Sequence, residues 1–461
     1  MNNIISFNCT EIGASHITKG KPCQDYSLSW SSDDKNTHIV IVCDGHGGDT
    51  YVRSDVGARI AAEVSLKIIR ETLDCIPPTL LLDKAGAVTA RPNTEDPLPL
   101  SHKVHETEEQ IAQNELFYKQ IENNKKQDSF FTHLFGRIYS EWDSLITEDS
   151  VQSPFNEEEL SLLGRANIEK AYGCTLMAFV RTPLYWFAFH IGDGKMLCLD
   201  NCHNWFEPVP WDCNCFLNVT TSLCANNPVP SFRYAFNGKG EFPIAVLLGS
   251  DGIDDSWQTM EKLQNFYNHT LSIFGDLGNE QAVKELKDYL PKLSEKGSRD
   301  DMSIAGIIDM EAIQRASAIF KKKEEITAKS TLIEKLKEEI LSIESNPAFI
   351  SINESINDAE KKTIVKSLFE VINAAIKEHR KQEVEAKEAK TRIEELCKER
   401  KMYEEQIEHL RIKIDGISNE CTLLKGELEE LTRREASNCE QTFLSWTRQR
   451  DKILTTENTI S

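Results

Sequence analysis

Residues 37–48 read THIVIVCDGHGG, in which an apolar run leads directly into a glycine-rich turn. The β-branched residues of 37–43 predict a short buried strand. Asp44 stands where that strand ends, and the glycines after it predict a tight turn. Apolar residues at helical spacing follow over residues 56–73, so the region is expected to form a strand–loop–helix unit.

Further strands are predicted along the first 310 residues. Residues 175–180 (TLMAFV) and 184–191 (LYWFAFHI) are separated by the short segment RTP and predict a hairpin. Residues 244–248 (IAVLL) and 302–308 (MSIAGII) predict two more buried strands. The strands and the few helices come in blocks and do not alternate strictly, which favours the α+β fold class.

The charge of the chain is concentrated in its first part. The net charge is −21, but residues 311–461 hold 27 Lys and Arg against 30 Asp and Glu, so −18 belongs to the first 310 residues. An acidic surface repels phosphate backbones, which argues against nucleic acid as a partner and against a nuclease activity. Clustered carboxylates are instead typical of sites for divalent cations.

The cysteines and the apolar runs indicate the compartment. The 13 cysteines are irregularly spaced, and neither a signal peptide nor a membrane-spanning run is recognised. We therefore expect a cytoplasmic protein with free thiols and no membrane partner. A zinc site is conceivable within residues 198–215, but the spacing of its cysteines and histidine fits no paired C-x-x-C motif, so buried thiols are the preferred interpretation.

The composition changes beyond position 310, where glycine and proline become rare and Glu, Lys and Ile dominate. Isoleucines seven residues apart predict a first helix, which Asn346-Pro347 would end. A later seam with strict alternation of three- and four-residue spacing predicts a coiled coil. Its members are Ile393, Leu396, Arg400, Tyr403, Ile407, Leu410, Ile414, Ile417, Cys421, Leu424, Leu428 and Leu431. Its partner could be another copy, the earlier tail helix or a different protein.

The expected domain organisation follows from these shifts. Residues 1–310 form the first domain, with an irregular insertion over about 77–130. A helical coiled-coil tail is expected over 311–450, broken near 346–354. Residues 451–461 are expected to form a flexible C-terminus.

Four aspartates stand at predicted strand ends or tight turns, namely Asp25, Asp44, Asp251 and Asp300. Any single Asp-Gly pair is most simply a turn. Several acidic residues at the ends of buried strands are costly, however, unless something compensates their charge. Mg²⁺ and Mn²⁺ prefer hard oxygen ligands, so the joint pattern predicts a divalent cation site.

Six motifs, in this order, resemble those of the metal-dependent 2C-type protein serine/threonine phosphatases in their bacterial form. They are residues 13–25 (GASHITKGKPCQD), 42–48 (VCDGHGG), 173–175 (GCT), 192–195 (GDGK), 248–255 (LGSDGIDD) and 300–303 (DDMS). Each motif alone is weak, whereas the ordered set is specific. The resemblance implies two β-sheets packed face to face and flanked by helices, with a binuclear Mn²⁺ or Mg²⁺ site at the sheet edges.

The resemblance also implies roles for individual residues. Asp44 would bridge both ions, the Gly45 carbonyl would bind one, and Asp251 and Asp300 would bind the other. Asp25 would hold water in the outer shell. Asp193 would ligate a third, more loosely held ion, and His46 would protonate the leaving serine or threonine oxygen.

The chain departs from the family pattern where the substrate phosphate is held. The family commonly has an arginine shortly before the position of Asp25, and here the nearby basic residues are Lys19 and Lys21. Lysine binds phosphate as a point charge and not as a bidentate fork. Lys21 is the candidate phosphate ligand, whereas His16 is interpreted as making a structural hydrogen bond.

The resulting hypothesis is a signalling hydrolase. It would hydrolyse phosphoserine and phosphothreonine in proteins, including targets of a cognate kinase, while the tail serves oligomerisation or partner recruitment. The alternative is a weakly active or inactive phosphatase-like sensor that acts as a scaffold through its coiled coil. Retention of all four principal aspartates favours the enzyme.

Overall fold

The computed structural model describes residues 3–75, 88–91, 125–212, 214–215, 219–257, 259–347, 350–351 and 379–460. Most of the expected 77–130 insertion and the residue Cys213 lie outside these ranges. Two compact units are formed, one by Met1–Phe320 with Thr432–Ser461 and the other by Lys321–Leu431.

The first unit contains a five-stranded antiparallel sheet in the order β1-β11-β10-β7-β8. Its first and last strands in sequence pair along their whole length, from Ile4 with Asp309 to Glu11 with Met302. The strands are β1 (Ile4–Glu11), β7 (Lys195–Leu199), β8 (Trp205–Phe206), β10 (Ala245–Gly249) and β11 (Met302–Asp309).

A second antiparallel sheet has six strands in the order β2-β3-β5-β6-β9-β4. The predicted hairpin of residues 175–191 is β5 paired with β6. The strands are β2 (Tyr26–Ser31), β3 (His38–Cys43), β4 (Val88–Arg91), β5 (Leu176–Arg181), β6 (Trp186–Ile191) and β9 (Arg233–Asn237).

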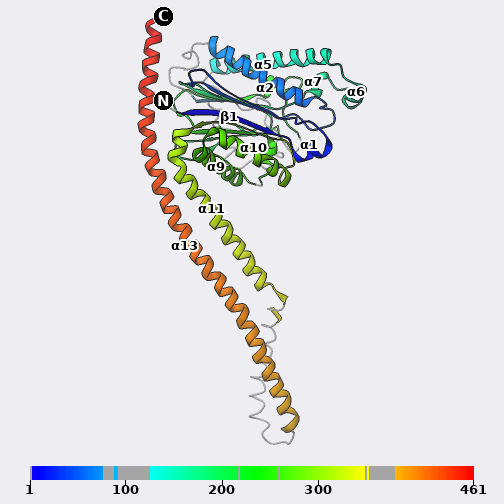
Figure 1. Cartoon of the computed structure of the whole chain (residues 1–461), viewed down its shortest axis with the longest axis vertical. Helices are drawn as coiled ribbons and strands as arrows, with labels where there is room; N and C mark the ends of the chain where they lie inside the picture. The colour runs from blue at the N-terminus through cyan, green and yellow to red at the C-terminus, as the bar shows by residue number, and fades with distance from the viewer. Residues whose placement is uncertain are drawn as a thin grey trace. The chain divides into compact units, whose positions relative to one another are not determined.

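Helices cover the outer face of each sheet, which gives four layers (Figure 1). The helices α2 (Ser54–Cys75) and α5 (Lys125–Gln152) pack on the six-stranded sheet. The helices α9 (Met260–Leu277) and α10 (Asn279–Lys296) pack on the five-stranded sheet. The shorter helices are α1 (Ala14–Lys19), α6 (Glu157–Leu163), α7 (Ile168–Ala171), α8 (Asp251–Asp254) and the 3-10 helix η2 (Val229–Ser231).

Strand β3 shows why the two sheets stack. All six of its residues are buried. Ile39 and Ile41 join the core under α2 and α5, whereas Val40 and Val42 join the core between the sheets. A strand that is apolar on both faces is stable only when both faces are covered. This architecture confirms the expected α+β sandwich of two sheets flanked by helices.

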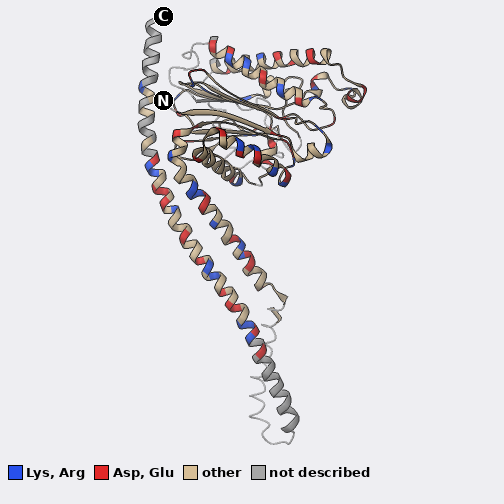
Figure 2. Ribbon diagram, viewed as in Figure 1, with Lys and Arg blue, Asp and Glu red and all other residues tan. Residues whose placement is uncertain are grey.

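The second unit, Lys321–Leu431, consists of parts of α11 (Met310–Glu344) and α13 (His379–Ile460). Ion pairs join the two helices within this unit, and the residue number on α13 falls as that on α11 rises, so the helices are antiparallel. The pairs are Lys322–Glu427, Lys329–Glu420 and Glu344–Arg411. Figure 2 shows acidic and basic side chains interspersed along both helices.

The predicted seam lies within this two-helix unit. Ile407, Leu410, Cys421 and Leu424 of α13 are buried, as is Leu336 of α11. The side chains of Ile393 and Leu396 are outside the described set. Ion pairs join α11 to α13 within this unit, which favours the earlier tail helix among the three partners left open by the sequence, while a coiled coil with it, with a second copy or with another protein stays a prediction.

The ends of the tail differ from the expected boundaries. The helix α11 ends at Glu344, just before Asn346-Pro347. The helix α13 continues to Ile460, beyond the tail boundary expected near 450, while the flexibility of residues 451–461 stays a prediction. Trp446 belongs to the same unit as the sheets, and its Nε1 donates to the Pro183 carbonyl at 3.0 Å. None of the helices in the described ranges is long and apolar enough to cross a bilayer.

Candidate functional site

Strand ends from both sheets bring acidic side chains to one place. Asp44 follows β3, Asp25 precedes β2, Asp251 begins α8 directly after β10, and Asp300 precedes β11. Asp193 lies in the turn between β6 and β7. The first three, Asp25, Asp44 and Asp251, are termed the acidic centre here.

The side chains of the acidic centre interact with one another. Burial raises the pKa of Asp44 well above its ordinary value, and the charges of Asp251 and Asp25 raise it further. Burial raises the pKa of Asp251 to about 6, while its hydrogen bond with Asp44 lowers the value. The charges of Asp193 and Asp300 oppose ionisation of Asp251 as well. These five aspartates are therefore close enough for the charge of one to affect the ionisation of Asp44 or Asp251.

Asp25 is the most deeply buried member of the acidic centre. It is 6% exposed, and its Oδ2 has no hydrogen-bond partner within the described part of the chain. Burial and the charge of Asp301 raise its pKa, although hydroxyl groups of Ser250 and Ser303 partly offset this effect. A buried carboxylate oxygen without a donor is costly unless a cation or water satisfies it.

Close backbone approach explains the glycines beside these aspartates. A Cβ at Gly45 would stand 2.5 Å from the Gln24 carbonyl oxygen, and one at Gly252 would stand 2.0 Å from the Asp301 carbonyl oxygen. Both distances are shorter than any tolerable contact, so only glycine fits. The turn that carries Asp44 therefore packs tightly against Gln24, and the turn that carries Asp251 packs tightly against Asp301.

Asp301 anchors the first motif to the last one. It is 3% exposed and accepts hydrogen bonds from the backbone N–H of Gly13 and Gln24, each at 2.6 Å. The Nδ1 of His16 lies 2.8 Å from its Oδ2. Burial alone would raise the pKa of Asp301, but these hydrogen bonds hold it below its ordinary value. The hydrogen bond with Asp301 raises the pKa of His16.

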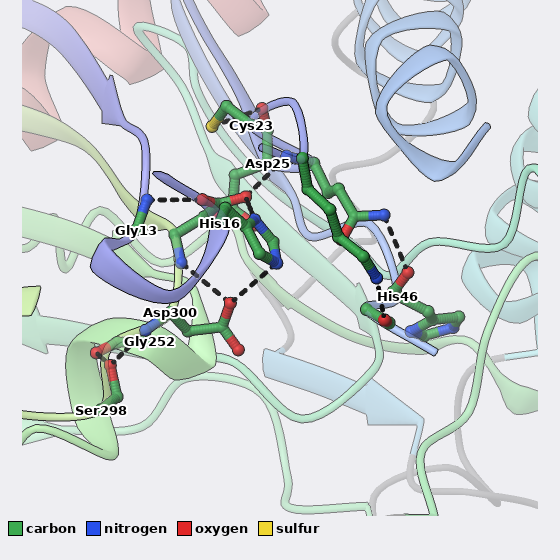
Figure 3. Close-up of polar contacts among 12 residues, drawn as sticks. Gly13, His16, Cys23, Asp25, His46, Gly252, Ser298 and Asp300 are labelled. Carbon is green, nitrogen blue, oxygen red and sulfur yellow. Dashed lines mark hydrogen bonds and ion pairs between the residues drawn. The ribbon is translucent and has the colours of Figure 1, made fainter. Parts of the chain in front are cut away.

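Asp300 is exposed toward solvent, unlike its neighbour. Its Oδ1 accepts a hydrogen bond from the Asp301 backbone N–H at 2.9 Å and lies 3.8 Å from the Nε2 of His16. Figure 3 shows the ring of His16 directed toward Asp300. The structure thus brings His16, Asp300 and Asp301 together as a group that could hold a metal ion.

His46 lies beside the acidic centre on the glycine-rich turn. Its Nε2 is 2.8 Å from the Ser222 hydroxyl, and its ring contacts Tyr51 edge to face with centroids 4.7 Å apart. The Nζ of Lys170 donates to the Tyr51 hydroxyl. Burial, aided by the charge of Lys170, lowers the pKa of His46 to about 4. The imidazole is therefore neutral near pH 7 in the metal-free protein.

The two remaining candidates lie at the rim of the site. Burial raises the pKa of Asp193, and the charge of Asp255 adds to the effect. Lys21 is half-buried, and its Nζ donates to the Gly47 carbonyl at 3.0 Å. Lys21 thus lies over the same turn as His46, where it can reach a phosphate group.

The donor set fits hard divalent ions. Carboxylate oxygens predominate, several of them are buried, and one buried oxygen has no partner in the described ranges. Mn²⁺ and Mg²⁺ favour such oxygen ligands and keep several waters. Asp44, Asp251, Asp300 and the Gly45 carbonyl could hold these ions.

Sequence reasoning missed several contributors. It assigned no role to Asp301, although a second aspartate directly after a candidate ligand was visible in the last motif. It also missed Ser222, Tyr51 and Lys170, which surround His46. No sequence signal connects these three with residue 46, because they come from distant segments.

Comparison with known protein families gives a match over much of the chain. The family model described as protein phosphatase 2C matches residues 12–291. No curated protein sequence gives a match.

Several solved structures are similar at low sequence identity. A bacterial serine phosphatase is 12% identical, covering 67% of this chain and 98% of its own, with a TM-score of 0.37. Serine/threonine phosphatase Stp1 from Staphylococcus aureus is 11% identical, with coverage of 67% and 95% and a TM-score of 0.37. The catalytic domain of the serine/threonine phosphatase PstP, in complex with two manganese ions, is 14% identical, with coverage of 66% and 97% and a TM-score of 0.36. Because the family model matches more than half of the 461 residues, the chain belongs to the protein phosphatase 2C family.

Proposed function

We propose that the protein hydrolyses phosphoserine and phosphothreonine in other proteins at a binuclear Mn²⁺ or Mg²⁺ centre. The observation that supports this proposal is the acidic centre, whose buried carboxylates raise one another's pKa. When bound, two such ions would lower the pKa of the attacking water and neutralise the charge on the phosphate.

The residues of the chain have separate tasks in this proposal. Asp44, the Gly45 carbonyl, Asp251 and Asp300 would hold the two ions, with Asp44 contributing to both. Asp25 would accept hydrogen bonds from metal-bound water and thereby orient it. The ammonium of Lys21, above the Gly47 carbonyl, attracts the substrate phosphate as a point charge.

His46 is proposed to protonate the leaving oxygen of serine or threonine. Its pKa of about 4 in the free protein would make it a weak proton carrier. A phosphate dianion beside the ring would oppose that lowering, because a nearby negative charge favours the imidazolium. Ser222, at 2.8 Å from Nε2, orients the ring.

The role of Asp44 is tested by hydrolysis of p-nitrophenyl phosphate and a phosphothreonine peptide with Mn²⁺. We expect Asp44→Asn to lower kcat/KM for both substrates by about a hundredfold or more, because the bridging ligand supplies several kcal/mol of charge stabilisation. The matched control is Asp33→Asn, an exposed aspartate in the turn between β2 and β3. Equal activity in wild type and Asp44→Asn would contradict the mechanism.

The role of His46 is tested by the dependence on the leaving group. Nitrophenolate leaves readily without a proton, whereas a serine or threonine alkoxide does not. We expect His46→Gln to lower the rate on the phosphothreonine peptide by about a hundredfold and the rate on p-nitrophenyl phosphate far less. Equal losses on both substrates would show that His46 acts in another way.

We also propose that the tail serves partner recruitment or oligomerisation and that the protein acts in the cytoplasm. The antiparallel unit of α11 and α13 supports a recruiting role, because its seam is already occupied within one chain. The solution mass of the full chain tests self-association. A mass of one chain over the micromolar range would leave recruitment of another protein as the role of the tail.

The alternative function, a phosphatase-like sensor that acts as a scaffold, has a separate test. A protein that binds phosphopeptide and Mn²⁺ but shows no turnover above the Asp44→Asn background would be a sensor. The retained aspartates make the active enzyme the favoured function.

A further inference from the structure

His16 makes more polar contacts than a purely structural hydrogen bond would require. It lies on α1, is 5% exposed, and directs its two ring nitrogens at two different carboxylates. The Nδ1 lies 2.8 Å from Asp301 Oδ2 and the Nε2 lies 3.8 Å from Asp300 Oδ1. An anchoring role would require only the first of these contacts.

The Asp301 carboxylate is committed to the protein itself. Its Oδ1 accepts from Gly13 N–H, and its Oδ2 accepts from Gln24 N–H and lies against His16 Nδ1. It is 3% exposed and both of its oxygens already accept hydrogen bonds, so of the three grouped residues it is the one placed to support the imidazole and not to ligate an ion. A carboxylate that receives the second ring N–H of a histidine is the usual support of a metal-bound imidazole, because it fixes the tautomer and the ring orientation.

The other ring nitrogen faces a candidate metal ligand. Two ligand atoms bound to one ion at about 2.1 Å stand roughly 3–3.5 Å apart. The 3.8 Å between His16 Nε2 and Asp300 Oδ1 is close to that spacing, and the two atoms would need to move together by only a few tenths of an ångström. Asp300 is the more exposed partner, and its Oδ1 also accepts the Asp301 backbone N–H at 2.9 Å.

The neighbouring acidic centre also lacks compensation. Asp25 lies beside Asp301, and its buried Oδ2 has no partner within the described residues. This oxygen indicates that a cation or its water is needed in the acidic centre, where the charge of Asp300 acts on Asp251.

We propose that His16 is a nitrogen ligand of the ion that Asp300 holds, oriented by Asp301 from behind. The inference rests on the proposed function, since it concerns an ion of the same centre. It changes the expected metal preference, because imidazole suits transition metals whereas Mg²⁺ favours oxygen ligands alone. The site would therefore select Mn²⁺ over Mg²⁺ more strongly than a centre built from carboxylates alone.

The substitution His16→Asn separates the two contacts of the ring. The asparagine amide nitrogen occupies approximately the place of Nδ1, so the hydrogen bond to Asp301 is kept while the Nε2 ligand is removed. The matched control is His133→Asn, because His133 is exposed on α5. Thermal unfolding in a chelator verifies that all proteins are folded.

Two readouts that do not depend on turnover are measured with the full chain. Calorimetric titration with Mn²⁺ and with Mg²⁺ gives the affinity of each ion. We expect His16→Asn to weaken Mn²⁺ binding about tenfold or more and Mg²⁺ binding much less. Electron spin-echo modulation of bound Mn²⁺ should show coupling to a directly bound ¹⁴N in the wild type and in His133→Asn, and none in His16→Asn.

The outcomes distinguish this inference from the proposed function. Mn²⁺ binding by the wild type without ¹⁴N coupling, or with coupling that persists in His16→Asn, overturns the histidine ligand and leaves the binuclear centre intact. An equal loss of Mn²⁺ and Mg²⁺ affinity in His16→Asn also overturns it. A wild type that binds neither ion removes the proposed function and this inference together.

Discussion

Two neighbouring regions of the molecule bury carboxylates in opposite ways. At the start of β11, Asp301 is surrounded by donors from Gly13, Gln24 and His16, and its pKa lies below the ordinary value. In the acidic centre, Asp25 and Asp44 are buried among other acids, and their pKa values are raised. Both regions lie at strand ends, but among the described residues Asp301 has hydrogen-bond donors at both oxygens, whereas Asp25 keeps one oxygen without a partner.

The difference indicates separate roles for the two regions. A buried carboxylate is tolerated when hydrogen bonds and charges compensate the loss of water. Asp301 is compensated internally, so it acts as a structural anchor. In the acidic centre, like charges raise the pKa values and one buried oxygen of Asp25 has no partner among the described residues, which supports the proposal that the centre binds cations.

The largest expected effect comes from breaking the satisfied region. Asp301→Ala leaves the Gly13 and Gln24 donors buried without an acceptor, and we expect it to lower the free energy of unfolding by about 3–5 kcal/mol. Denaturant unfolding in a chelator measures this loss. The comparison variant Asp300→Ala, at an exposed position, should change stability little. Similar small losses for both variants would contradict the anchoring role.

His38, a buried base outside both regions, makes a contribution to the free energy of unfolding that depends on pH. His38 lies with Nδ1 2.9 Å from the Ser31 hydroxyl and Nε2 3.0 Å from the Lys35 carbonyl, and burial lowers its pKa to about 4. Between pH 6.5, near the pKa of His38 in the unfolded chain, and about pH 4, the unfolded chain binds a proton at His38 that the folded chain does not bind. Stability is therefore lost as the pH falls through this window, by about 3 kcal/mol from this group.

The variant His38→Gln tests that contribution. It should be less stable than the wild type at pH 7, because the fit of the ring is lost, but its stability should fall less steeply between pH 6.5 and 4. The control His133→Gln, at an exposed position, should keep the steep wild-type dependence. Parallel pH profiles for the wild type and His38→Gln would rule out the buried neutral state.

The smallest expected effect is a gain. Asp44→Asn removes one of several like charges from the acidic centre and keeps the shape of the side chain. In a chelator at pH 7 we expect the variant to be about 1 kcal/mol more stable than the wild type. A destabilisation comparable to that of Asp301→Ala would mean that Asp44 is compensated by the protein, and the contrast between the two regions would fail.

Part of the fold and of the candidate site could be predicted from the sequence. Local patterns predicted strand β3 and the β5–β6 hairpin, because apolar runs and turn residues act over a few positions. The acidic strand ends were visible for the same reason. The pairing of His46 with Ser222 and of Asp301 with Gly13 was not predictable, since these contacts depend on how distant segments pack.

For the tail, too, the sequence predicted a local pattern but not the long-range contact. The heptad pattern identified which face of α13 is buried, as Leu410 and Leu424 confirm. It carried no information on the partner, because any helix with an apolar seam satisfies the same spacing. The ion pairs Lys329–Glu420 and Arg411–Glu344 identify α11 as one partner only once the coordinates are known.

The central claim is that the acidic centre lacks positive charge until divalent ions bind. Calorimetric titration of the chelator-treated full chain with Mn²⁺ at pH 7, for wild type and Asp44→Asn, tests it most directly. The account predicts that the wild type binds two ions and that Asp44→Asn loses at least one of them, with affinity for the rest reduced. Identical titration curves for the two proteins, or no binding by the wild type, would contradict it.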